Sequence, residues 1–155
     1  VWVDQGHINT TPGASIDYEF VVADVMEIIA GMNIAAIGFD RWRIDIMKKE
    51  FERAGADVPL VEFGQGFKDM SPALDALESV LLNGNIRHGM NPVLTMCAAN
   101  ASVDSDAAGN RKFTKQKSTG RIDGMVALAM ALGMTCAKEP ESHAHEQVVF
   151  DLNAV

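Results

Sequence analysis

The chain has 155 residues, of which 48% are hydrophobic, so we expect one compact domain over residues 1–137 and a tail over residues 138–155. Its formal net charge of -8 argues against a protein that grips nucleic acid with its whole surface, because phosphate binding depends on Lys and Arg. No apolar run has the length of a membrane span. Cys97 and Cys136 stand in apolar stretches, which indicates core thiols in a reducing compartment.

The first residues, 1–6, contain neither an initiator methionine nor the pattern of a signal peptide. We therefore expect the chain to be a piece of a longer protein. A short strand is predicted over residues 7–10, before the turn-forming sequence Thr11-Pro12-Gly13.

Helices and strands then alternate. A helix is predicted from Asp17, as its cap, to Gly31. The apolar run 34–39 predicts a strand that is buried on both faces and central in its sheet. An amphipathic helix over residues 43–54 and a strand over residues 58–63 follow. This order favours an α/β layer in which helices cover a mainly parallel sheet.

The second half of the chain contains more helices and an inserted hairpin. Ser71 as N-cap and Pro72 at the first position predict a helix that runs to Gly84. Another helix is predicted after Asn91-Pro92, and residues 103–113 are expected to form a hairpin around Ala-Ala-Gly-Asn. The last helix, residues 122–137, has a wide apolar face that predicts packing against the sheet.

Two acidic residues are the main candidates for chemistry. Asp40 directly follows the buried strand, and ligands of open parallel sheets bind at the carboxyl ends of strands. Asp123 stands in the first turn of the last helix. Each also has an ordinary explanation, because an acid at a helix start can be a cap or interact with the helix dipole. Together, two such carboxylates can converge and share divalent cations.

Basic residues crowd the segment before Asp123. They are Lys112, Lys115, Lys117 and Arg121, and we expect them to bind DNA phosphates, although a solvated loop is the alternative explanation. His88 is a possible auxiliary residue. A lone His is more commonly used for structural hydrogen bonding, but it can also act as a base or a ligand.

Five motifs resemble one known family. They are Gly38-Phe39-Asp40-Arg41-Trp42, Phe63-Gly64-Gln65-Gly66-Phe67 with Met70-Ser71-Pro72-Ala73, the run from Ile86 to Leu94, Ala108-Gly109-Asn110-Arg111-Lys112, and the run from Lys115 to Gly124. In this order they resemble the C-terminal nuclease part of the large terminase subunit of tailed bacteriophages, from about Gly6 to Gly133.

The resemblance implies an RNase H-like mixed sheet flanked by helices, with an inserted β-hairpin and its first strand missing. It implies an endonuclease that cuts concatemeric phage DNA during genome packaging with two Mg²⁺ or Mn²⁺ ions. Asp40 and Asp123 match two of the three metal-binding acids of the family. The first acid would precede Val1, so we expect the isolated chain to have lost part of its site.

The resemblance also implies partners: double-stranded DNA, the portal protein and the small terminase subunit, in the cytoplasm of the bacterial host and without a membrane. One alternative is a non-catalytic fragment that binds DNA or the portal. Another is a different RNase H-like enzyme, such as a resolvase or an integrase, which the order of the motifs disfavours. An uncovered sheet edge would favour self-association.

Overall fold

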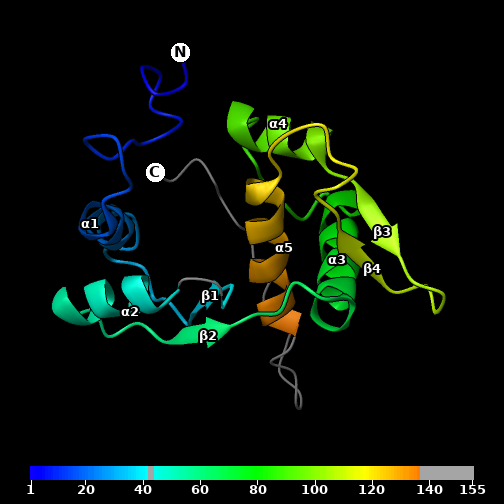
Figure 1. The fold of residues 1–155 in the computed structure, drawn as a ribbon. Helices are drawn as coiled ribbons and strands as arrows, with labels where there is room; N and C mark the ends of the chain where they lie inside the picture. The colour runs from blue at the N-terminus through cyan, green and yellow to red at the C-terminus, as the bar shows by residue number, and fades with distance from the viewer. Residues whose placement is uncertain (42–43, 137–155) are drawn as a thin grey trace. The chain divides into compact units, whose positions relative to one another are not determined.

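The computed structural model describes residues 1–41 and 44–136, and these fall into two compact units (Figure 1). The first unit is Val1–Glu62, and the second begins at Phe63. The predicted tail, residues 138–155, lies outside the described residues, and the single domain over residues 1–137 stays a prediction. None of the described helices is long and apolar enough to span a membrane.

The first unit contains two helices in contact, α1 (Tyr18–Ile28) and α2 (Ile44–Arg53). Val22 of α1 and Phe51 of α2 are its buried apolar residues. Asp17 caps α1 as predicted, since its Oδ1 accepts a hydrogen bond from the Phe20 amide at 3.2 Å.

Two short strands lie on either side of α2 in the chain, β1 (Ile37–Phe39) and β2 (Leu60–Glu62). They pair in parallel, with Phe39 opposite Glu62, so the predicted strand–helix–strand crossover is confirmed. The prediction of a strand buried on both faces is wrong, because β1 is only half-buried. In the described residues β1 has one neighbouring strand, β2, and a two-stranded ladder cannot enclose it.

The strand predicted over residues 7–10 is also absent, since these residues form a bend and an irregular segment. This segment is held by side-chain hydrogen bonds and not by the backbone hydrogen bonds of a sheet. The Asn9 amide donates to both carboxylate oxygens of Asp24, at 2.8 and 3.0 Å, which attaches this segment to α1.

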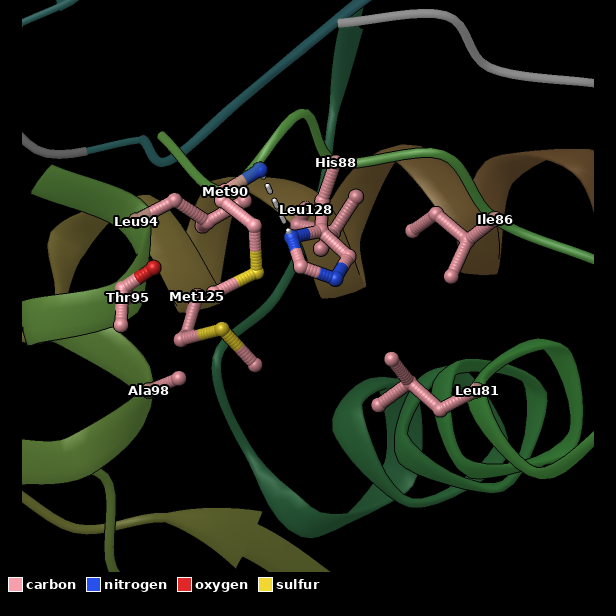
Figure 2. Close-up of a pocket in the computed structure, with 9 residues that line it drawn as sticks. All are labelled: Leu81, Ile86, His88, Met90, Leu94, Thr95, Ala98, Met125 and Leu128. Atoms are coloured by element: carbon pink, nitrogen blue, oxygen red, sulfur yellow. Dashed lines mark hydrogen bonds between the residues drawn. The ribbon is translucent and has the colours of Figure 1, made fainter. Parts of the chain in front are cut away.

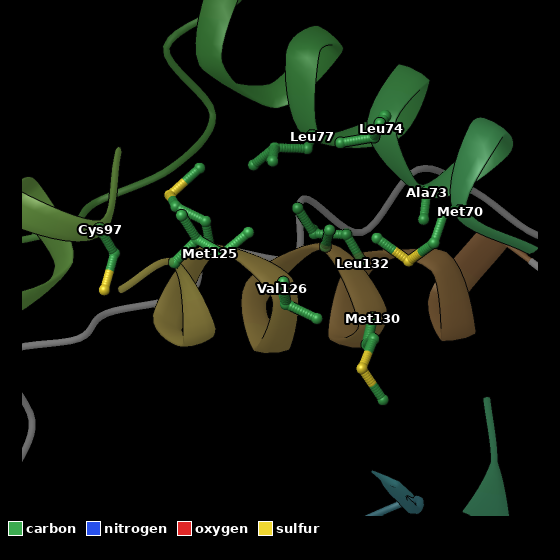
Figure 3. Packing of buried hydrophobic residues seen from close by; sticks show 11 residues of the cluster. Met70, Ala73, Leu74, Leu77, Cys97, Met125, Val126, Met130 and Leu132 are labelled. Carbon is green, nitrogen blue, oxygen red and sulfur yellow. The ribbon is translucent and has the colours of Figure 1, made fainter. Parts of the chain in front are cut away.

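The second unit is built on three helices, α3 (Phe67–Leu82), α4 (Pro92–Asn100) and α5 (Asp123–Cys136). Helix α5 lies alongside α3 and also contacts α4 (Figure 1). Figure 3 shows Leu74 and Leu77 of α3 pointing towards α5, within a buried cluster that includes Cys97. Helices cover the wide apolar face of α5 here, and its packing against the parallel strands stays a prediction.

Small residues allow α3 and α5 to approach closely. A Cβ atom on Gly133 of α5 would lie 2.8 Å from the Ala73 Cβ of α3 and 2.8 Å from Cζ of Phe63. Both distances are shorter than van der Waals contact. Glycine is therefore required at position 133 for this packing.

Helix α3 begins five residues before the predicted start. Its N-cap is Gly66, and Pro72 lies inside the helix, so the prediction of Ser71 as N-cap is wrong. The Ser71 hydroxyl instead accepts a hydrogen bond from the Arg111 amide at 3.1 Å. Pro72 is the sixth residue of the helix, past the first turn, so its lack of an N–H removes one backbone hydrogen bond of the helix.

The predicted hairpin is confirmed as the antiparallel pair β3 (Val103–Ser105) and β4 (Arg111–Phe113). Its turn is closed by Asp106, whose Oδ1 accepts from the amides of Ala108 and Asn110, each at 2.9 Å. The Asn110 side chain also donates to this carboxylate and lowers the pKa of Asp106.

The hairpin is attached to α3 by Arg111. One guanidinium nitrogen of Arg111 lies 2.5 Å from Oδ1 of Asp75 and 2.8 Å from Oε2 of Glu78, both on α3. These bonds, to Asp75 first and then to Glu78, raise the pKa of Arg111. Together with the Ser71 contact, they fix β4 on the helix.

Candidate active site

Asp123 is the first residue of α5, and its carboxylate is accessible. Its side chain is 62% exposed, and its Oδ1 lies 3.3 Å from the Lys115 ammonium nitrogen. The helix start favours a negative charge at this position, because unpaired backbone N–H groups point outward there. The carboxylate of Asp123 is therefore open to a ligand.

An open pocket of about 320 Å³ surrounds this carboxylate, lined by Lys115, Gly120, Arg121, Ile122 and Asp123. Ile122 itself is buried in the hydrophobic core, which anchors the segment before Asp123. The pocket therefore combines two cationic side chains with one carboxylate. Such a combination can bind an anion such as a phosphate and, beside it, a cation.

The other two predicted DNA-binding residues have partners within the chain. The ammonium of Lys112 lies 4.6 Å from the centre of the Phe67 ring, where it makes a cation–π contact. Lys117 lies 2.8 Å from Oδ1 of Asp104, and this hydrogen bond is the main cause of the lowered pKa of Asp104. Lys115 and Arg121 are thus the predicted basic residues that line the pocket of Asp123.

Asp40 lies in the first unit, immediately after β1, and is half-buried. Sequence reasoning overlooked its neighbour Glu62, which ends the parallel strand β2 and is paired in register with Phe39. Glu62 forms an ion pair of 3.5 Å with Arg41. The end of this two-stranded sheet thus carries two acids and one base, a grouping that the parallel register could have predicted.

His88 does not line the Asp123 pocket. It lines a separate apolar pocket of about 190 Å³ between α3, α4 and α5 (Figure 2). Its Nδ1 accepts a hydrogen bond of 3.3 Å from the Met90 amide, and Met90 has a positive φ of 55°. This bond supports the turn before α4. An auxiliary role of His88 in chemistry stays a prediction.

The acids of the described residues do not form a complete metal site. Among residues 1–41 and 44–136, no three His, Cys, Asp or Glu side chains lie close enough together to hold a metal ion. Asp40 and Asp123 belong to different compact units. Their joint role as metal ligands therefore stays a prediction.

Comparison with known proteins defines the class. Residues 1–139 match the family described as the terminase large subunit, endonuclease domain. The chain therefore belongs to this family.

Individual relatives agree with the family. The large subunit of the terminase of Enterobacteria phage HK97 is 63% identical over 133 residues, which are 86% of this chain and 26% of that protein. A crystal structure of the HK97 bacteriophage large terminase is similar with a TM-score of 0.80 and 62% identity, over 86% of this chain and 28% of the other. Protein YmfN of Escherichia coli K12 is 27% identical over 150 residues, 95% of this chain and 32% of that protein. The chain thus spans about a third or less of each relative.

Proposed function

We propose that this chain is the DNA-cutting part of a large terminase, which hydrolyses phosphodiester bonds of concatemeric phage DNA during genome packaging. The observation that carries the proposal is the pocket in which Lys115, Arg121 and Asp123 meet. Membership of the endonuclease domain family supports the reaction class.

The proposed metals are two Mg²⁺ or Mn²⁺ ions, with Asp40 and Asp123 among their ligands. Carboxylate oxygens are the donors that such hard cations prefer, so the residues fit in chemical type. They do not suffice in number, and a third acid on a strand before Val1 is part of the proposal. When bound, two such ions supply an activated water and stabilise the leaving oxygen.

The roles of the side chains follow from their charges. Lys115 and Arg121 would bind the DNA backbone phosphate, since both cations line the pocket and guanidinium binds phosphate oxygens in a fork. The carboxylate of Asp123 would turn away from Lys115 to hold a metal ion. Lys112 and Lys117 would add a weaker attraction, because neither lines the pocket of Asp123 and each contacts another part of the chain.

The complete fold is proposed to be RNase H-like, with β1 and β2 as part of a larger mixed sheet. The TM-score of 0.80 with the HK97 large terminase supports this proposal. Partners by the same likeness are double-stranded DNA, the portal protein and the small terminase subunit, within the bacterial host. Self-association through the sheet edge is a further proposal, supported by the exposed Val61 on β2.

Plasmid cleavage in Mn²⁺ by a version of the chain extended upstream tests the proposal. We expect Asp40→Ala and Asp123→Ala each to reduce cleavage to background, whereas Asp57→Ala, an exposed acid in a loop, should leave it unchanged. If neither Asp40→Ala nor Asp123→Ala lowered cleavage, the metal-site assignment would be wrong.

A second candidate function is a non-catalytic piece that binds DNA or the portal. It is favoured because no group of three metal-ligating side chains occurs in the part of the chain that the structure describes. The same assay on the 155-residue chain separates the two. Cleavage only by the extended version would show that the 155-residue chain does not cut, and binding of a DNA duplex would then test the second function.

A further inference from the structure

One side chain, Asn100 at the end of α4, holds the segment that leads into Asp123. Its Oδ1 accepts a hydrogen bond from the Thr119 hydroxyl at 3.0 Å, and its Nδ2 donates to the Arg121 carbonyl at 3.2 Å. Gly120 lies between these two contacts, and a Cβ there would be 2.6 Å from Nδ2. We call this arrangement of Asn100, Thr119, Gly120 and Arg121 the Asn100 clamp.

The clamp acts on the residues that form the pocket. Gly120 and Arg121 line it together with Lys115 and Asp123. The earlier part of the loop has its own supports, since the Ser102 hydroxyl donates to the Lys117 carbonyl at 3.2 Å. Further along, the Ser118 hydroxyl donates to the Thr114 carbonyl at 2.6 Å, and Asn100 holds Thr119 and Arg121, the residues just before buried Ile122.

An amide is required to make both bonds. Thr119 needs an acceptor and the Arg121 carbonyl needs a donor, and an Asn side chain offers one of each. An Asn at a helix end can bond to neighbouring backbone groups. Asn100 instead reaches residues 19 and 21 positions further along the chain. Asn100 thus stabilises the loop that contains Thr119 and Arg121.

We infer that Asn100 is a positioning residue for phosphate binding: it fixes the backbone of Thr119–Arg121 so that Arg121 stands beside Lys115 and Asp123 before DNA arrives. Ordering the loop in advance removes an entropy cost from binding. This inference rests on the proposed function, because it takes the pocket to bind a DNA phosphate.

The test measures binding of a short DNA duplex by the full chain in EDTA, with fluorescence anisotropy as the readout, over a range of salt concentrations. The slope of log K against log salt is negative, and a lost phosphate contact reduces its magnitude by about 1. We expect Asn100→Ala to weaken binding by about tenfold and to reduce this magnitude as Arg121→Gln does. The double variant should lose no more than Arg121→Gln alone.

Two further variants make the test specific. Thr119→Val removes one bond of the clamp at nearly constant volume and should reproduce part of the Asn100→Ala effect. Gly120→Ala should weaken binding in the natural chain but not in the Asn100→Ala background, where the opposing amide is gone. The control is Asn83→Ala, which removes a similar amide-to-carbonyl bond at the end of α3.

The outcomes separate two failures. If Arg121→Gln binds DNA like the natural chain, the proposed phosphate pocket is wrong, and the position of Arg121 has no effect on binding. If Arg121→Gln loses affinity but Asn100→Ala keeps the natural salt slope, or loses affinity additively with Arg121→Gln, the clamp inference alone is overturned. A lower melting temperature with an unchanged slope would likewise make Asn100 a purely structural residue.

Discussion

Lys115 and Asp123 face each other across the start of α5, with 3.3 Å between the ammonium nitrogen and the carboxylate oxygen. Both side chains are more than half exposed, at 69% and 62%. An exposed pair of this kind contributes only about 0–1 kcal/mol to stability, because water screens it. The pair can therefore open at little cost when each charge meets a ligand.

Lys115→Gln should separate binding from stability. We expect the free energy of unfolding to change by less than about 1 kcal/mol, while the magnitude of the salt slope of DNA binding falls by about 1. Urea unfolding and fluorescence anisotropy measure the two quantities. Lys49→Gln, an exposed lysine of α2, serves as the control and should change neither. A large loss of stability in Lys115→Gln would contradict the proposed role.

Gly133→Ala should destabilise the second unit. The added methyl would lie 2.8 Å from Ala73 and from the Phe63 ring, so helices α3 and α5 must move apart. Overpacking of this kind costs about 1–3 kcal/mol. Ala131→Leu adds more volume on the exposed face of the same helix and should change stability by less than about 0.5 kcal/mol in urea unfolding. Equal effects of the two variants would refute the close approach.

The hairpin should lose stability in acid. Lys117 lowers the pKa of Asp104 and Asn110 lowers that of Asp106, both from 3.8, so the folded state favours the ionised carboxylates. This stabilisation is complete above the unfolded value of 3.8 and is lost as the pH falls through the lowered values.

Thermal unfolding of the natural chain and of the variant Asp104→Asn/Asp106→Asn, from pH 7 downwards, measures this loss. The natural chain should be the more stable at pH 7, and the difference should disappear in strong acid. A difference that stays constant over the whole range would show that the two carboxylates do not stabilise the fold through their charge.

Arg111→Met should loosen the hairpin without unfolding the core. The substitution keeps the apolar stem but removes both bonds to α3, with Asp75 and with Glu78. We expect amide hydrogen exchange in β3 and β4 to become faster by roughly fivefold, the equivalent of about 1 kcal/mol. Exchange in α5 provides the internal control, and equal acceleration there would indicate global destabilisation instead.

Local signals predicted much of the fold. Asp17 acts as the predicted cap because its side-chain oxygen accepts from the amide three residues away, an interaction contained in a short stretch of sequence. The hairpin was predictable for the same reason, since its turn is closed by residues of the turn itself.

Long-range partners account for the errors. Ser71 before Pro72 is a normal helix start, but the Ser71 hydroxyl is used by an amide 40 positions further along the chain. The Lys117–Asp104 pair depends on how the loop folds back on the hairpin, which no local pattern shows. For the site, the sequence identified the acids and bases, whereas their distances depend on packing between distant segments.

The firm attachment of β4 to α3 also makes the hairpin tip a favourable place for a reporter group. Ala107 is exposed in a turn that Asp106 closes with its own hydrogen bonds, and the anchoring residue Arg111 lies outside that turn. Exposed loop tips tolerate additions that buried backbone does not. A dye on a cysteine introduced at Ala107 would therefore move with α3, and its fluorescence could follow the arrival of DNA without altering the pocket at Asp123.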